Sequence, residues 1–71
     1  MKLAFFYLKP ESYGWVVYAE QRPDGRQFFV AKSLALTYAQ LWAEANRPSK
    51  LQLLDRHGAV DREWLYEPLV A

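Results

Sequence analysis

The amino-acid sequence predicts an α+β fold in the element order β-β-β-α-β-β, an antiparallel sheet of four to five strands with one helix packed on one face. Three observations predict this class. Short aromatic and β-branched segments lie in both halves of the chain, one longer segment between them has helical periodicity, and clusters of turn-forming residues separate the short segments. A chain of 71 residues has room for only one small core, so residues 1–71 are expected to form a single domain.

The first half of the chain is expected to form three strands. Residues 2–9 (KLAFFYLK) are aromatic-rich and too short for a stable helix, and residues 15–20 (WVVYAE) are β-branched and aromatic. The third strand, residues 26–31 (RQFFVA), follows residues 22–25 (RPDG). Proline pre-sets the first central position of a turn and glycine supplies a positive φ, so this tetrapeptide predicts a hairpin with antiparallel strands.

One helix is expected over residues 34–46. Ser33 is a good N-cap residue, and Asn46 followed by Pro48 ends the helical pattern. Large apolar side chains recur at helical spacing, which predicts that they form the stripe that packs on the sheet. This stripe consists of Leu34, Tyr38, Leu41, Trp42 and Ala45. The opposite face, expected to meet solvent, carries Thr37, Gln40 and Glu44.

Two further strands are expected after the helix. Residues 50–55 (KLQLLD) alternate between apolar and polar side chains, and residues 59–66 (AVDREWLY) form the last strand. Between them, Asp55 opens a turn and Gly58 stands where the backbone needs a left-handed conformation. These residues predict a second antiparallel hairpin.

The composition limits the functions that this chain can have. The chain is 52% hydrophobic and 17% aromatic, which excludes an intrinsically disordered protein. It has no cysteine and one histidine, so no disulfide, cofactor or metal site is expected. A net charge of +1 gives no strong field for nucleic acid or anionic lipid, and no apolar run approaches the ~18 residues of a membrane-spanning helix. We therefore expect a cytoplasmic protein that does not enter a membrane.

No constellation of catalytic residues stands out, and we expect that the protein is not an enzyme. His57 is the only candidate base at neutral pH, and its place inside a turn explains it without chemistry. Nothing in the sequence places this base beside a candidate nucleophile. The candidate nucleophiles are Ser12, Ser33 and Ser49. Three carboxylates share one face of the last strand and its end: Asp61, Glu63 and Glu67. They predict a solvated face rather than a cation site.

The aromatic residues of the first three strands are the most informative feature for function. Side chains alternate between the two faces of a strand, and here both faces are apolar. One helix can cover only one face, so an apolar patch should remain, and such patches mark interaction sites. We therefore expect a small non-enzymatic protein-interaction module that forms a homodimer through this patch or binds another protein. The candidate interface residues are Phe6, Tyr18, Phe28 and Val30.

Two alternatives compete for the same patch. Within the monomer, the apolar carboxyl tail, residues 68–71, or a curled sheet could cover it. In the other alternative the aromatic side chains stack bases, and the protein is a nucleic-acid-binding accessory protein. The candidate contacts to nucleic acid are Lys9, Arg22, Arg26 and Lys32. Basic residues exceed acidic ones only slightly in this half of the chain, which favours the homodimer.

Short motifs spread over residues 13–66 resemble a known family. They are Gly14-Trp15-x-Val17, a Ser-capped helix with Ala35, Ala39 and Ala43, the segment Leu51-x-Leu53-x-Asp55-Arg56-His57-Gly58-x-Val60, and Tyr66. Together they are similar to the small bacterial domain-of-unknown-function family twenty-one eighty-eight. The resemblance implies a shared fold, and because that family carries no known activity, it implies no catalytic residue.

A weaker similarity concerns the first three strands and the helix. The Gly-Trp start, the Pro-Asp-Gly segment and the helix that follows are similar to the arm-binding domain of tyrosine recombinases. That resemblance implies recognition of DNA by the sheet. The last two expected strands have no place in its pattern, which favours the first family.

Overall fold

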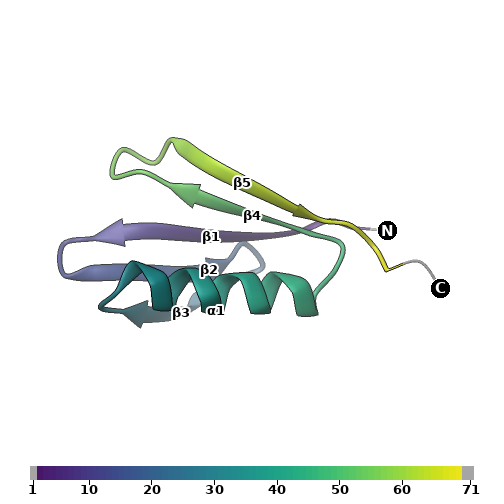
Figure 1. Cartoon of the computed structure of the whole chain (residues 1–71), viewed down its shortest axis with the longest axis horizontal. Coiled ribbons are helices and arrows are strands. Elements are labelled where there is room, and N and C mark those ends of the chain that lie inside the picture. Colours follow the sequence, from purple (N-terminus) through teal and green to yellow (C-terminus); the bar gives the residue numbers. More distant parts are fainter. Residues whose placement is uncertain (1, 70–71) are drawn as a thin grey trace.

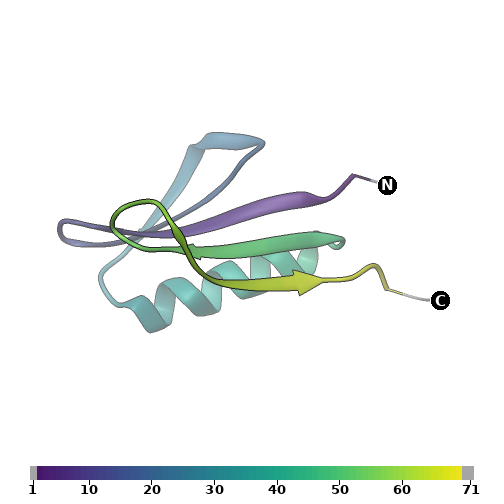
Figure 2. The ribbon, with the colours of Figure 1, turned by 90° about the horizontal axis from the view of Figure 1, so that it is seen from above.

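The computed structural model describes residues 2–69 and contains six elements in the predicted order (Figure 1). They are β1 (Ala4–Glu11), β2 (Gly14–Ala19), β3 (Arg22–Phe29), α1 (Lys32–Ala45), β4 (Ser49–Leu54) and β5 (Val60–Tyr66). The five strands form one sheet in the order β3-β2-β1-β4-β5, and α1 lies along one face of it (Figure 1, Figure 2). The predicted α+β class is therefore confirmed.

One pair of strands departs from the expected antiparallel arrangement. β1 runs parallel to β4, with Ala4 opposite Ser49 and Leu8 opposite Leu53, while the other three pairs are antiparallel. The path of the chain explains this, because α1 follows the edge strand β3 and returns the chain across the sheet to the free side of β1. A helix is the usual connection between parallel strands. β1 is thereby the central strand.

The hairpin between β2 and β3 turns earlier than predicted. Ala19 pairs with Arg22, so Glu20 and Gln21 form its tip, and residues 22–25 lie inside β3 instead of at the turn. The register shifts next to this tip, where two residues along β2 correspond to five along β3. The residues expected to turn the chain therefore occupy an irregular stretch of the edge strand.

This register decides which face of the sheet Phe29 joins. A turn centred on the predicted residues would have placed Phe29 opposite Tyr18, and a shift by an odd number of residues exchanges the two faces. In the observed register Phe29 lies opposite Trp15 and packs against the core. Its ring centroid is 5.2 Å from that of Tyr38 on the helix. Packing against the helix therefore outweighs the local turn preference.

The helix contacts the sheet through its small side chains. Ala35, Ala39 and Ala43 are fully buried and form the helix side of the core. The sheet side of the core consists of Phe6, Leu8, Val17, Ala19, Leu51 and Leu53. The large side chains of the sheet already fill this layer, so only small side chains fit on the helix face that meets it. Alanines at a spacing of four residues lie on one face and let the helix backbone approach the sheet closely.

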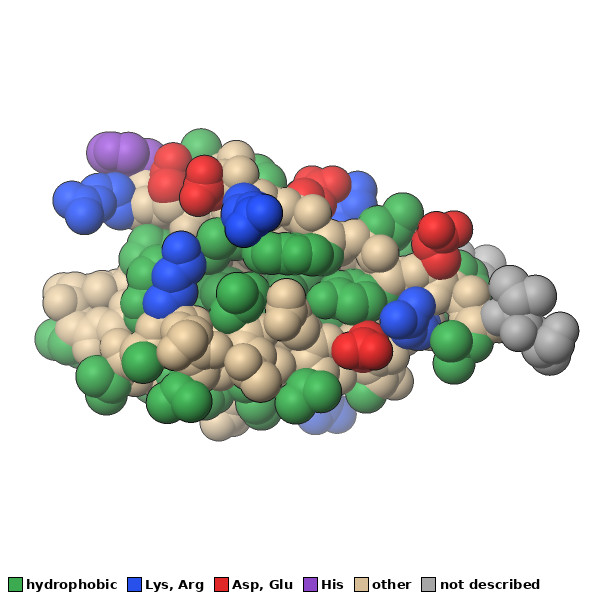
Figure 3. All heavy atoms as spheres, in the orientation of Figure 1, with side chains coloured by type: hydrophobic (Ala, Val, Ile, Leu, Met, Phe, Trp, Pro, Cys, Tyr) green, Lys and Arg blue, Asp and Glu red, His purple; other side chains and the backbone are tan. Residues whose placement is uncertain are grey.

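The predicted buried stripe is therefore wrong for most of its members. Leu34 and Leu41 are 61% and 63% exposed, and Tyr38 and Ala45 are also exposed. Trp42 is half-buried with its ring centroid 4.8 Å from that of Phe6, and the more exposed Tyr38 contacts the rings of Phe29 and Trp42. Figure 3 shows the helix side of the molecule, with many hydrophobic side chains at its surface.

The two ends of the helix differ in how well the sequence predicts them. Because the helix starts at Lys32, Ser33 lies inside the first turn and cannot cap it; Ala31 is the N-cap residue, without a side-chain hydrogen bond. The prediction of a Ser33 cap is therefore wrong. Asn46 is the C-cap residue, as predicted, and its Nδ2 donates a hydrogen bond to the Trp42 carbonyl oxygen at 2.8 Å.

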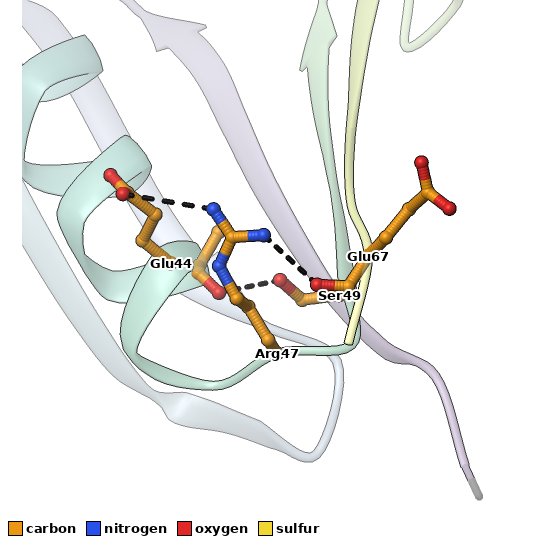
Figure 4. Close-up of polar contacts among 5 residues, drawn as sticks. Glu44, Arg47, Ser49 and Glu67 are labelled. Atoms are coloured by element: carbon orange, nitrogen blue, oxygen red, sulfur yellow. Dashed lines mark hydrogen bonds and ion pairs between the residues drawn. The ribbon is translucent and has the colours of Figure 1, made fainter. Parts of the chain in front are cut away.

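Polar contacts tie the end of α1 to the sheet (Figure 4). The hydroxyl of the buried Ser49 donates a hydrogen bond to the carbonyl oxygen of Ala43. Arg47 lies 3.7 Å from the Glu44 carboxylate and donates to the backbone carbonyl oxygen of Glu67 at 2.9 Å. These contacts hold the helix end, the start of β4 and the residue after β5 together.

The predicted turn between β4 and β5 is confirmed in its details. The Asp55 carboxylate accepts hydrogen bonds from the backbone N–H groups of Ala59 at 3.0 Å and His57 at 2.8 Å. These bonds favour the charged form and lower the pKa of Asp55 below its usual value. Gly58 has a φ of 85°, the left-handed conformation that its position requires.

Candidate interaction surface

The sheet has an outer face, which we define as the face turned away from α1. Side chains alternate along a strand, so the neighbours of each core residue lie on this face. From the first three strands it carries Phe5, Tyr7, Lys9, Val16, Tyr18, Arg26 and Phe28. Both ribbon views place the helix on the opposite face (Figure 1, Figure 2). Among the described residues, no second layer covers the outer face.

Aromatic side chains form a cluster at the middle of this face. The ring centroids of Tyr7 and Tyr18, which pair across β1 and β2, are 5.2 Å apart. The guanidinium of Arg26 lies over the Tyr18 ring at 5.1 Å, and the Tyr7 hydroxyl donates to the Glu20 carboxylate at 3.0 Å. Next to them, Phe28 is 61% exposed. The face therefore presents two half-buried tyrosine rings and the exposed Phe28 to solvent, while Val16 beside them is fully buried.

Burial and Glu20 change the acidity of Tyr7. Desolvation disfavours the phenolate, and the hydrogen bond and the negative charge of Glu20 act in the same direction. Together they raise the pKa of Tyr7 to about 12. The hydroxyl therefore stays neutral and keeps its hydrogen bond over the whole physiological range.

Charges of both signs surround the aromatic cluster. Lys9 lies 3.7 Å from Glu11, and on the other half of the sheet Lys50 lies 3.2 Å from Glu63. Glu63 also accepts a hydrogen bond from Gln52 at 3.0 Å, and the contacts with Gln52 and Lys50 lower its pKa. Positive and negative groups therefore alternate on this face, and neither sign dominates it.

The four predicted interface residues do not lie together. Tyr18 and Phe28 are on the outer face, but Phe6 is only 3% exposed and belongs to the core under the helix. The placement of Phe6 on the interaction surface is therefore corrected, because its register position opposite Ala19 turns it towards the helix. Val30 follows β3 and is 88% exposed, beside Phe28 and Tyr13 in a shallow hollow of about 320 Å³.

The carboxyl-terminal segment does not cover the outer face as far as the structure describes it. Residues 67–69 are exposed, and both ribbon views show this segment leaving the sheet beyond the end of β5 (Figure 1, Figure 2). The remaining two residues of the segment, 70 and 71, lie outside the described part of the chain.

The four candidate contacts to nucleic acid lie on different sides of the molecule. Lys9 and Arg26 are on the outer face. Arg22 lines a hollow on the helix side, and Lys32 lies over the Trp15 ring at 5.4 Å. The structure therefore does not gather them into one phosphate-binding stripe.

The candidate catalytic residues are also apart. His57 is exposed in the turn between β4 and β5, Ser12 is exposed in the turn after β1, and Ser33 is exposed on α1. Ser49 is buried, and its hydroxyl is bound to the helix end. Within residues 2–69, no three metal-ligating side chains gather, and no helix is long and apolar enough to cross a membrane.

Sequence reasoning missed a hollow of about 460 Å³ on the helix side of the sheet. It lies where the last turn of α1, with Trp42 and Asn46, passes over the start of β1 and the tip of the β2–β3 hairpin. Its lining includes Ala4, two residues before Phe6 on β1, and Ala19, which lies opposite Phe6 on β2. The signal in the sequence was the presence of these two small residues at inward-facing positions.

Comparisons of the chain with protein-family models, with curated proteins and with solved structures find no significant match. The similarity to family twenty-one eighty-eight therefore remains a prediction from short motifs.

Proposed function

We propose that this protein is a small non-enzymatic protein-interaction module that forms a homodimer through the outer face of β1, β2 and β3. The aromatic cluster of Tyr7, Tyr18 and Phe28 is the observation that supports this function, because no described layer covers it. Exposed apolar patches mark interaction sites. A domain of this size has one small core, and burying a second apolar surface against a partner would add to its stability.

The charge pattern supports a second copy as the partner. A two-fold symmetric dimer brings one surface against itself, so that surface must be complementary to itself. The outer face is compatible with this condition, because its charges lie in pairs of opposite sign: Lys9 with Glu11 on β1 and, on the neighbouring strands β4 and β5, Lys50 with Glu63. A nucleic-acid partner would need positive charge gathered on this face, and only two of the four candidate contacts lie there.

Light scattering on a gel-filtration peak tests this proposal. We expect the parent protein to give about twice the chain mass of 8.3 kDa at tens of micromolar protein. Phe28→Glu should shift the protein to the monomer, because a charge in a desolvated apolar interface weakens association by at least about tenfold. Far-ultraviolet circular dichroism would verify that the variant stays folded.

Leu41→Glu is the matched control, since Leu41 on the helix is 63% exposed and Phe28 is 61% exposed. It adds the same charge at an equally exposed apolar position outside the outer face, and we expect the dimer to persist. A parent protein that stays monomeric would contradict the proposal. A dimer that Leu41→Glu dissociates and Phe28→Glu does not would place the interface on the helix.

A further inference from the structure

The hollow beside the last turn of α1 has the size of a small-ligand site. Its volume of about 460 Å³ lies within the range of roughly 300–1,000 Å³ that such sites occupy. Trp42 and Phe6 provide an aromatic wall, with ring centroids 4.8 Å apart and ring planes at 59°. Phe6 is only 3% exposed and supports the wall from below, so it is the half-buried Trp42 that offers ring surface to the hollow, where a flat apolar group can pack.

The strand register places one positive charge at the end of this wall. Arg22 pairs with Ala19, and Ala19 pairs with Phe6, so the three residues form one row across β3, β2 and β1 on the helix side. Because the middle residue of the row is alanine, space remains between the guanidinium and the aromatic wall. Trp42 then stands above one end of the row and Arg22 at the other.

Arg22 has no hydrogen-bond or ion-pair partner among the described residues, and the described lining contains no carboxylate. The carbonyl oxygens of Trp42 and Ala43 at the nearby helix end do not substitute for a carboxylate partner of Arg22. The Trp42 carbonyl oxygen accepts from the Asn46 side chain, and the Ala43 carbonyl oxygen accepts from Asn46 and Ser49. The guanidinium is therefore available for an anion, and its two parallel N–H groups match a carboxylate.

From this arrangement we infer that the hollow binds a small molecule or peptide end in which a flat apolar group lies next to a single carboxylate. The apolar group packs on the Trp42 ring, which Phe6 supports from the core, and the carboxylate pairs with Arg22. The amide side chains of Gln21 and Asn46, which also line the hollow, provide further polar contacts at its rim. A nucleotide fits less well, because its phosphate carries more charge than one arginine can neutralise.

Two probes that differ only in the carboxylate test this site. They are N-acetyl-phenylalanine and its neutral amide, titrated into the protein while the indole N–H signals are followed by NMR. We expect the acid to shift the Trp42 signal with a Kd on the order of 1 mM, typical of a small ligand in an open site. The Trp15 and Trp64 signals should stay in place, and the amide should bind about tenfold more weakly.

Variants separate the two halves of the site. Arg22→Gln should weaken the acid about tenfold and leave the amide unchanged. Arg56→Gln is the control, because it removes the same charge from an exposed residue in the β4–β5 turn, at the opposite end of the sheet from the end of α1 (Figure 1). Ala4→Leu fills the hollow without removing a polar group, and it should abolish binding of both probes.

The inference would be overturned if acid and amide bound equally, if Arg56→Gln weakened the acid as much as Arg22→Gln, or if Ala4→Leu bound normally. Tighter binding of adenosine monophosphate than of the acid would assign the hollow to nucleotides instead. These outcomes are independent of the dimer, because the probes and variants concern the helix side and the proposed interface lies on the outer face.

Discussion

At the scale of single residues, Tyr7 links the central strand to the hairpin tip. Its hydroxyl donates to Glu20, which follows β2, and its ring lies beside Tyr18. The side chain is half-buried, so removal of the ring from water and the neighbouring carboxylate both act on the same hydroxyl. The titration of Tyr7 therefore reports whether the side chains of the proposed interaction surface are held in place.

The first residue-scale prediction concerns stability at high pH. The pKa of Tyr7 is raised from 10.0 to about 12, so its neutral hydroxyl contributes fully below about pH 10. This contribution is lost as the pH rises towards 12, because the unfolded chain releases the proton first. The free energy of unfolding, measured with urea, should therefore fall more steeply between pH 10 and pH 12 for the parent than for Tyr7→Phe. Tyr13→Phe is the control, since that exposed tyrosine has no hydrogen-bond partner among the described residues.

Parallel pH profiles for the parent and Tyr7→Phe would contradict this account. They would mean that the Glu20 contact does not hold in solution and that the aromatic cluster is less ordered than the structure describes.

Gly14 is a second residue on which the arrangement depends. A Cβ at this position would lie 2.3 Å from the carbonyl oxygen of Phe29, and the φ of Gly14 is 155°. Only glycine allows β2 and β3 to approach this closely where β2 begins. The close approach keeps Phe29 against the helix, while its neighbour Phe28 remains on the outer face.

At the scale of elements, the helix is positioned by its smallest side chains. Ala35, Ala39 and Ala43 have no room to grow, whereas Leu34 and Leu41 have solvent around them. In an ordinary amphipathic helix the large apolar residues would be the costly ones to remove. Here the cost lies in enlarging the small ones.

This leads to a pair of opposite expectations for stability. Ala39→Leu should lower the free energy of unfolding by about 1–3 kcal/mol, because the added side chain forces the helix away from a filled sheet layer. Leu41→Ala should change it by less than about 0.5 kcal/mol, the usual effect of a surface substitution. Midpoints of urea unfolding would measure both. A large loss for Leu41→Ala with little change for Ala39→Leu would restore the stripe that the sequence predicts.

Local chemistry explains which of the sequence predictions hold. The Asp55–Gly58 turn and the Asn46 cap depend on a few neighbouring residues, and the element order depends on periodicity. Which side of the helix faces the sheet does not follow from local chemistry, because it depends on how much space the side chains of the sheet leave. The hairpin tip likewise moves to Glu20 so that Phe29 can pack. Of the candidate site, alternation within a strand places neither Phe6 nor Phe28 relative to Tyr18, because both positions depend on the register between strands.

At the scale of the whole molecule, the two edges of the sheet are not equivalent. The helix packs mainly on β1, β2 and β4 and reaches the flank of β3, so β5 lies beyond its main contacts. β5 is joined to the sheet by its pairing with β4 and reaches the core with Trp64 and Tyr66. The domain therefore has a well-packed centre and one edge strand with fewer supports.

Native-state amide hydrogen exchange should follow this difference. Amides of β1 should exchange only through global unfolding, since β1 has a strand on each side and the helix across it. The hydrogen-bonded amides of β5 should exchange faster, through local opening of the edge. Equal protection of β1 and β5 would contradict this expectation and would mean that the sheet opens only as one unit.

The parallel pairing of β1 with β4 also determines when the domain can fold on the ribosome. β2 leaves the exit tunnel soon after β1, but Ser49, the partner of Ala4, is made 45 residues later. Until then, one edge of the central strand stays open to any other extended chain nearby. Pairing of β1 with the distant β4 is slow compared with formation of the hairpins. The incomplete chain on the ribosome is therefore the state in which this protein is most exposed to misassembly.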